Sequence, residues 1–283
     1  RYMVKIIADT TAVLPHHIAD KYHIPIIPQL IHFGDQTYIE GEDIDNQTFL
    51  EKLKKSDILP KTAAPPPEFF TEQFKQMVST GEPILCIHPS TDLSGTVRSA
   101  TVASQGFPEA NIQVVDTRLV ASPLGIVVEK AAEWAETGKD IESIKNDVID
   151  LSRQGKIFFL VATLDFLARG GRIGGASAFI GNALKLKPIL TLEDGKVEPF
   201  GKERTMKRAL NRLKELVLSQ YPTDGKGYLT IMHSDVPEKA KALSAHFQEH
   251  LGIEPPRISN LPPAIITHAG PGALAVGFFD TQV

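Results

Sequence analysis

The strongest fold signal in the chain is residues 84–96, ILCIHPSTDLSGT. Its first four residues are apolar, which predicts a buried strand over Ile84–Ile87. A polar loop rich in proline, serine and threonine follows, and a helical pattern begins at Thr96. A strand that leads through such a loop into a helix is the building unit of α/β proteins.

The same alternation of strands and helices continues along the sequence. The candidate strands are Lys5–Ala8, Ile24–Ile27, Ile84–Ile87, Ile112–Val115, Phe158–Ala162, Lys187–Leu192, Tyr228–His233 and Ala264–His268. The candidate helices are Pro15–Tyr22, Pro67–Val78, Thr96–Ser104, Gly125–Thr137, Ile141–Arg153, Thr205–Ser219 and Pro237–His250. Buried strands separated by crossover helices predict an α/β fold with largely parallel sheets flanked by helices.

The length of the chain predicts two domains, because 283 residues exceed one average domain. The pattern is interrupted at residues 153–156, just before the apolar run that starts at Ile157. We therefore expect an N-terminal α/β domain at residues 1–155 and a C-terminal α/β domain at residues 156–283. In an alternative arrangement, the final predicted strand, Ala264–His268, packs near the first domain instead.

Composition excludes several classes of protein. The chain is 42% hydrophobic and 23% charged, which is typical of a folded globular protein. Its 30 basic and 34 acidic residues are interspersed, which argues against nucleic acid or an anionic membrane surface as the main partner. The uncharged run Ile258–Phe279 contains Pro262, Pro263 and Gly270, which would break a spanning helix. We expect a soluble, cytoplasmic protein without a transmembrane segment.

Two motifs match known signatures without the context that those signatures need. His246–His250 reads H-x-x-E-H, but a helical wheel places Glu249 opposite the apolar stripe and no third metal ligand is evident. Gly270–Ala275 fits a relaxed G-x-G-x-x-A pattern, yet only 8 residues follow it, too few for the acidic residue of a dinucleotide site. The chain also lacks a P-loop and a G-x-S-x-G elbow. We therefore expect neither a metal nor a nucleotide cofactor.

Polar residues occur in three loops where α/β proteins commonly bind anions. Ser94 precedes the helix that starts at Thr96, and Gly95 beside it would let a ligand approach the backbone closely. Thr62 lies ahead of three prolines that stiffen its loop, and His268 precedes a glycine turn, where it can donate to a carboxylate. The alternatives are an N-cap role for Ser94 or Thr96, a simple loop threonine and a structural histidine.

Motifs along nearly the whole chain resemble those of one protein family. They are ADTTA at 8–12, LSGT at 93–96, VDT at 115–117, TLDFL at 163–167, GGRI at 170–173, KPIL at 187–190, RT at 204–205 and HAGPGA at 268–273. Together they resemble the DegV family, the fatty-acid-binding subunits of bacterial fatty acid kinases. The resemblance implies a two-domain α/β protein with a long-chain fatty acid between the domains.

The resemblance also implies roles for individual residues. The family's carboxylate ligands, a threonine, a serine and a histidine, fall on Thr62, Ser94 and His268. Proteins of this kind present the carboxylate to a separate kinase, which uses ATP to form an acyl-phosphate, and Arg204 is expected to contact that kinase. The resemblance implies a lipid-binding subunit with no catalytic residue and no cofactor.

A bound lipid agrees with simple energetics. Each buried methylene contributes ~0.8 kcal/mol, so about 14 of them contribute on the order of 11 kcal/mol before ordering costs. The head group then serves mainly to fix the position of the carboxylate. The candidate tunnel walls are Phe158, Phe159, Phe166, Phe179 and Ile180.

Two other functions stay open at this stage. One is an acyl hydrolase or transferase that uses Ser94 with His268. The missing nucleophile elbow and the lack of an evident acid to orient the histidine argue against it. The other is a sensor of acyl chains, which would differ from a carrier in its partner rather than in its pocket.

Overall fold

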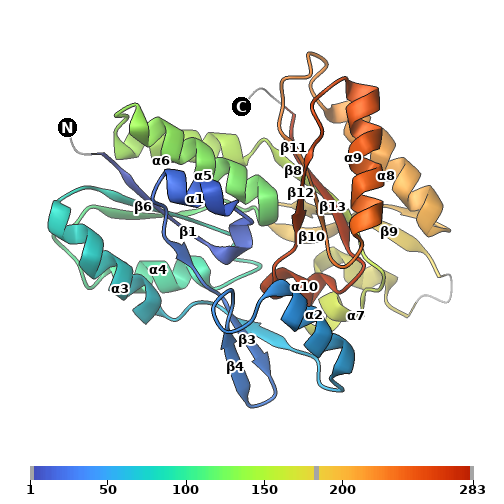
Figure 1. Ribbon diagram of the computed structural model, residues 1–283, viewed down its shortest axis with the longest axis horizontal. Coiled ribbons are helices and arrows are strands. Elements are labelled where there is room, and N and C mark those ends of the chain that lie inside the picture. Colours follow the sequence, from blue (N-terminus) through green and yellow to red (C-terminus); the bar gives the residue numbers. More distant parts are fainter. Residues whose placement is uncertain (1–2, 182–184, 281–283) are drawn as a thin grey trace.

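The computed structural model describes residues 3–181 and 185–280. In its first half, four strands form a parallel sheet in the order β2-β1-β6-β7 (Figure 1). Their bounds are Lys5–Asp9 for β1, Ile26–Ile27 for β2, Ile84–His88 for β6 and Ile112–Asp116 for β7. The parallel α/β arrangement predicted from the sequence is therefore confirmed for this half.

Helices cover both faces of this first sheet (Figure 1). They are α1 (His16–Lys21), α3 (Pro67–Met77), α4 (Thr96–Ser104), α5 (Ala121–Glu136) and α6 (Ile141–Ser152). Neighbouring side chains of β1 point to opposite faces, as the pleat requires. Ile6 packs in the core with α5 and α6, whereas Ile7 packs in the core with α3 and α4.

A second sheet of six strands has the order β10-β9-β8-β13-β11-β12. Its strands are β8 (Gly155–Leu160), β9 (Lys187–Glu193), β10 (Lys196–Glu203), β11 (Leu229–His233), β12 (Arg257–Asn260) and β13 (Leu274–Phe279). β11 and β12 run parallel, but the other neighbouring pairs of described strands are antiparallel. The prediction of a largely parallel second sheet was wrong, because central strands covered on both faces show the same unbroken apolar runs in either direction.

The two faces of the second sheet have different neighbours. Helices α8 (Met206–Gln220) and α9 (Pro237–Leu251) cover one face, where Phe158 and Val276 join the core. The other face carries Phe159 and Ala275 and packs with the short helices α7 (Asp165–Arg169) and α10 (Pro263–Ala269). This inner face lies toward the first half of the chain (Figure 1).

Helix α10 replaces the strand predicted over Ala264–His268. Pro263 occupies its first turn, where a missing N–H costs nothing, and Oε2 of Glu40 accepts from the N–H of Ala264 at 2.8 Å. The run Ala264–His268 begins with only three apolar residues, too few for periodicity to distinguish helix from strand. α10 contacts elements of the first half, whereas β13, which follows it, lies in the centre of the second sheet.

A small antiparallel sheet, β4-β3-β5, was not predicted. It consists of β3 (Leu30–Phe33), β4 (Gln36–Ile39) and β5 (Lys61–Ala63), and helix α2 (Asn46–Lys55) lies between β4 and β5 in the sequence. Asp45 caps α2 by accepting from the N–H of Thr48 at 2.7 Å. Pairing of β5 with β3 places Thr62 opposite Ile31 and fixes its position. The division into domains at residues 1–155 and 156–283 stays a proposal.

Candidate functional site

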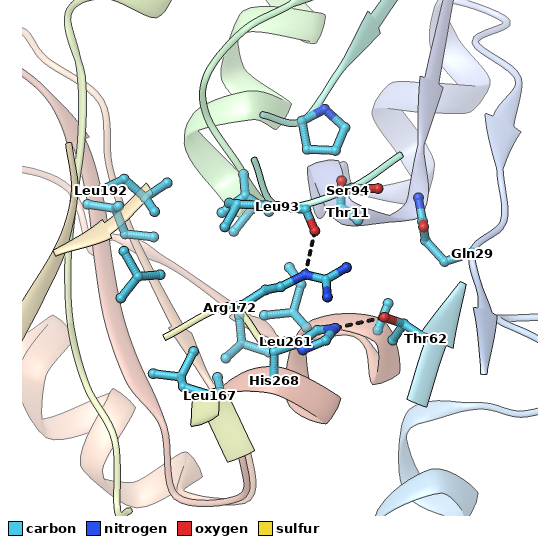
Figure 2. A pocket seen from close by; sticks show the side chains of 18 of the residues that line it. Thr11, Gln29, Thr62, Leu93, Ser94, Leu167, Arg172, Leu192, Leu261 and His268 are labelled. Atoms are coloured by element: carbon cyan, nitrogen blue, oxygen red, sulfur yellow. Dashed lines mark hydrogen bonds between the residues drawn. The ribbon is translucent and has the colours of Figure 1, made fainter. Parts of the chain in front are cut away.

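A cavity lies between the inner face of the second sheet and the loops at the carboxyl ends of the first sheet (Figure 2). Its apolar lining includes Leu93, Val120, Ala121, Ile157, Phe159, Leu167, Leu192, Val197, Leu261, Ala264, Ile265, Ala269, Ala273 and Ala275. Its polar lining includes Thr11, Gln29, Thr62, Ser94, Arg172 and His268. In Figure 2, Gln29, Ser94 and Thr62 lie on the right and Leu192 lies on the left. The cavity therefore has a polar end and an apolar slot, which suits an amphipathic ligand.

Four residues predicted from the sequence meet at the polar end. The structure places Thr62, Ser94, Gly95 and His268 in the lining of the cavity. Thr62 comes from β5, Ser94 and Gly95 come from the loop between β6 and α4, and His268 comes from the last turn of α10. The fifth predicted residue, Arg204, is exposed just after β10 and does not line the cavity.

Thr62 and His268 form a hydrogen-bonded pair in which Oγ1 of Thr62 lies 2.7 Å from Nε2 of His268 (Figure 2). Burial, and to a smaller degree the charge of Arg172, lowers the pKa of His268 to about 4, so its ring is neutral near pH 7. Nδ1 of the ring is buried without a partner among the described residues. A buried N–H without an acceptor costs more than an unpaired lone pair. The proton therefore belongs on Nε2, which donates to Thr62 and leaves the hydroxyl proton of Thr62 for a ligand.

The backbone of α7 holds the other side of the His268 ring. A Cβ atom at Gly170 would lie 2.2 Å from Nδ1 of His268, so a side chain at this position would displace the ring. The conformation of Gly170 is ordinary, with φ −77°. The glycine is thus required by the closeness of the histidine and not by its own backbone.

Ser94 is fixed by the start of helix α4. Its Oγ accepts from the N–H of Thr96 at 3.2 Å and lies 2.7 Å from Oγ1 of Thr96. The N-cap residue of α4 is Gly95, whose position has no side-chain cap. A Cβ atom at Gly95 would touch Cβ of Ala64 at 3.4 Å. The loop that carries Ser94 therefore packs directly against the segment that follows β5, the strand of Thr62.

Arg172 is a cation at the polar end for which the sequence motif GGRI gave no role. Its Nε donates to the carbonyl of Leu93 at 2.9 Å, and its Nη1 donates to the carbonyl of Gly170 at 2.8 Å. No carboxylate pairs with it among residues 3–181 and 185–280. In Figure 2 its guanidinium lies between Ser94 and His268. An unpaired cation at this point attracts an anionic head group.

Thr11 and Gln29 also line the polar end and were not predicted as site residues. Thr11 belongs to the motif ADTTA, and its hydroxyl donates to Oδ1 of Asp9 at 2.6 Å. Gln29 lies directly before β3 and belongs to no motif that the sequence offered. Its role becomes visible only from its partners in the structure.

A second hollow adjoins the polar end from outside. It shares Thr62, Arg172 and His268 with the cavity and is bordered in addition by Lys61 and Arg169. Lys61 and Arg169 are exposed. The three shared residues are therefore reachable from a surface region that carries two exposed basic residues and the exposed Asp57.

The predicted tunnel walls are only partly in contact with the cavity. Phe159 lines it, and Phe166 borders the second hollow. Phe158 points to the opposite face of the second sheet, where its ring packs against Phe200. Phe179 and Ile180 are absent from the lining described for residues 3–181 and 185–280.

None of the helices within residues 3–181 and 185–280 is long and apolar enough to cross a membrane. This finding agrees with the prolines and glycines noted in the run Ile258–Phe279. That run forms β12, α10 and β13 in succession.

Comparison with known proteins identifies the family. A family model described as the DegV family matches residues 3–281. A DegV domain-containing protein of Clostridium acetobutylicum is 34% identical over 283 residues, covering 99% of this chain and 98% of the relative. A DegV domain-containing protein of Streptomyces coelicolor is also 34% identical and covers 96% of this chain and 97% of its own.

Solved structures show the same fold. A fatty acid binding DegV family protein of Streptococcus agalactiae has a TM-score of 0.91 at 29% identity and covers 100% of both chains. DegV of Bacillus subtilis, described as a fatty acid binding protein, has a TM-score of 0.89 at 30% identity and covers 99% of both chains. A DegV family protein of Thermus thermophilus described for its fatty acid binding has a TM-score of 0.85 at 31% identity, covering 98% of this chain and 99% of its own. The resemblance predicted from the sequence motifs is confirmed, and this chain belongs to the DegV family.

Proposed function

We propose that this protein binds one long-chain fatty acid and presents its carboxylate to a separate ATP-dependent kinase, which converts it to an acyl-phosphate. The carboxylate lies among Thr62, Ser94 and His268, and the acyl chain fills the apolar slot. The observation that carries the proposal is the cavity itself, which combines hydroxyl donors at one end with an apolar lining at the other. Three solved relatives that are 29–31% identical to this chain are described as fatty acid binding proteins.

The chemistry of the polar end fits a carboxylate. Thr62 has a hydroxyl proton to donate because Nε2 of the neutral His268 already donates to its oxygen. Arg172 adds a positive charge that has no carboxylate partner among the described residues. An ionised carboxylate accepts such bonds through both oxygens and donates none.

Energy for binding comes mainly from the slot. Burial of an acyl chain contributes ~0.8 kcal/mol per methylene, so the head group needs little affinity of its own. The hydroxyls of Thr62 and Ser94 hold the carboxylate in position without transferring a proton to it, and the neutral His268 orients Thr62. The carboxylate thereby stays a nucleophile, and one of its oxygens can attack the γ-phosphorus of ATP while the bond to the ADP oxygen breaks.

Presentation to another protein is supported by the second hollow. Thr62, Arg172 and His268 border both the cavity and this hollow, so the head group faces outward there. Lys61 and Arg169 at its border suit an incoming polyphosphate. We propose that the kinase docks over this region, that Arg204 contributes to the contact, and that the protein acts in the cytoplasm, where ATP is available.

The alternative of an acyl hydrolase is disfavoured by geometry. Ser94 pairs with Thr96, and His268 pairs with Thr62, so the two residues do not form a nucleophile and base pair. The unpartnered Nδ1 of His268 has no acid to orient the ring among the described residues. Hydrolase sites of this type need both contacts.

The proposal is tested by extracting the purified, denatured protein with organic solvent and analysing the extract by mass spectrometry. A near-stoichiometric free fatty acid is expected. Delipidated protein reloaded with oleic acid is then offered to a fatty acid kinase with labelled ATP. The double variant Thr62→Ala with Ser94→Ala is expected to stay folded and to lose most acyl-phosphate formation, whereas exposed Ser79→Ala with Thr80→Ala is the matched control and is expected to match the wild type. Absence of a bound lipid, or unchanged transfer in the first variant, would refute the proposal.

A further inference from the structure

A buried network of hydrogen bonds extends behind the polar end of the cavity. Its centre is Asp9, which caps the 3₁₀ turn Thr10–Ala12. Oδ1 of Asp9 accepts from the N–H of Thr11 at 2.9 Å and from its hydroxyl at 2.6 Å. Oδ2 accepts from Nδ1 of His88 at 2.7 Å. Asp9, Thr11 and His88 are all buried, so this carboxylate is a fixed acceptor inside the protein.

The carboxylate of Asp9 sets the orientation of the Gln29 amide. Nε2 of Gln29 lies 3.2 Å from Oδ1 of Asp9. Because a carboxylate accepts hydrogen bonds, the nitrogen of the amide, and not its oxygen, has to face Asp9. The same nitrogen lies 2.9 Å from Oγ1 of Thr96 and donates its second hydrogen there.

The direction of donation continues to Ser94. Oγ1 of Thr96 receives a hydrogen from Gln29, so its own hydrogen is free for Oγ of Ser94 at 2.7 Å. The N–H of Thr96 also donates to Oγ of Ser94, at 3.2 Å. With two bonds accepted, the hydroxyl of Ser94 has its proton left over. Ser94 lines the cavity, on the same side as Gln29 in Figure 2. The remaining proton therefore points to the ligand.

We infer that Asp9, Gln29 and Thr96 are positioning residues that fix Ser94 as a hydrogen-bond donor, so that the site selects ionised carboxylates over alcohols. The inference rests on the proposed function and deepens it by naming what selects the head group. A carboxylate accepts the proton of Ser94 and brings no proton of its own. An alcohol of the same chain forms no charge-assisted bonds, and its hydroxyl hydrogen meets Ser94 and Thr62, both of which donate.

The residues that set this direction come from separate parts of the sequence. Gln29 is 20 residues from Asp9 and 67 residues from Thr96. They meet because Asp9 ends β1, Gln29 directly precedes β3 and Thr96 begins α4. Each of the three is buried, and Asp9 and Thr96 lie outside the lining described for the cavity, so these two act on the ligand without touching it.

The test compares the affinities of the delipidated protein for oleic acid and for oleyl alcohol by competition against a fluorescent fatty acid. Thr96→Val keeps the shape of the side chain and removes its hydroxyl, and Gln29→Met removes the amide that donates to it. Each is expected to weaken oleic acid binding about tenfold more than oleyl alcohol binding, so that the acid-to-alcohol preference falls about tenfold. Thr96→Ser retains the hydroxyl and is expected to keep the wild-type preference.

Three results would overturn the inference. The first is a wild-type protein that binds the acid and the alcohol equally, which decides the matter even where a variant fails to fold. The second is an unchanged preference in folded Thr96→Val or Gln29→Met, and the third is a Thr96→Ser variant as impaired as Thr96→Val. A wild-type protein that binds neither ligand refutes the proposed function itself, and with it the inference.

Discussion

Replacing Gly170 by alanine tests how the head-group histidine is held. The new Cβ atom would lie 2.2 Å from Nδ1 of His268, whereas an ordinary contact begins near 3.4 Å. The ring must therefore retreat by roughly 1 Å, which breaks its 2.7 Å bond to Thr62. Losing this partly buried bond costs about 1–3 kcal/mol. The backbone of Gly170, with φ −77°, can accommodate alanine without strain. Alanine lowers the conformational entropy of the unfolded chain, which stabilises the folded protein by about 0.4–1 kcal/mol and offsets part of the loss.

The expected net loss for Gly170→Ala is thus about 1–2 kcal/mol of unfolding free energy, with about tenfold weaker oleic acid binding. Urea unfolding of a double-mutant cycle with His268→Ala isolates the cause, because the penalty should vanish once the ring is gone. Gly106→Ala is the control, since its Cβ atom meets a helix carbonyl, that of Ala103, at 3.3 Å but no histidine. The reasoning fails if Gly170→Ala is as stable as the wild type, or if its cost persists in the His268→Ala background.

Three further predictions concern titration, packing and reactivity. Burial lowers the pKa of His268 to about 4, so between pH 4 and 6.5 the unfolded chain binds more protons than the folded protein, and the unfolding free energy falls as the pH drops. Burial raises the pKa of Glu40 to about 7, so between pH 4.5 and 7 the folded protein binds more protons, and the stability that Glu40 contributes is lost as the pH rises. Urea unfolding between pH 4.5 and 6.5 should therefore show the unfolding free energy rising with pH in Glu40→Gln, where His268 remains, and falling with pH in His268→Gln, where Glu40 remains. The same dependence of stability on pH in both variants would contradict this. Gly125→Ala should lower Tm, with a cost of about 1–3 kcal/mol, because the new Cβ atom lies 2.3 Å from the carbonyl oxygen of Ala12. A higher Tm, as helix propensity alone predicts, would refute that contact. Burial raises the pKa of the Cys86 thiol, so a maleimide should label the protein in urea and not in its native state at pH 8.

The first half of the fold was predictable because its signals are local. The apolar run Ile84–Ile87 is bounded by a polar loop, and the helix that follows starts at Thr96, as expected. The strand directions of the second sheet were not predictable from the sequence. Strands β8 and β13 are buried on both faces, and such apolar runs do not show whether neighbouring strands are parallel or antiparallel. The short run Ala264–His268 became a helix through Pro263 and Glu40, and Glu40 lies 224 residues from the N–H it accepts from.

Ser94 and His268 were predicted because they occur in recognisable motifs, whereas Thr62 was predicted from its proline-stiffened loop and from the family resemblance. The structure brings Thr62, Ser94 and His268 to one cavity, but their roles as ligands come from the family resemblance and stay a prediction. Gln29 was missed because its importance depends on Asp9 and Thr96, which are distant in sequence. The sequence alone offers no signal for a side chain whose only partners are made by the tertiary fold.

The pairing of Thr62 with His268 has a consequence for biosynthesis. The two residues are 206 positions apart, and the helix that carries His268 precedes the strand at the centre of the second sheet. A nascent chain still on the ribosome lacks the histidine until α10 has emerged, after all strands of the first sheet. The polar end of the cavity is therefore assembled only after α10 has been synthesised, and until then the apolar lining contributed by earlier segments lacks its partner, which favours aggregation or proteolysis.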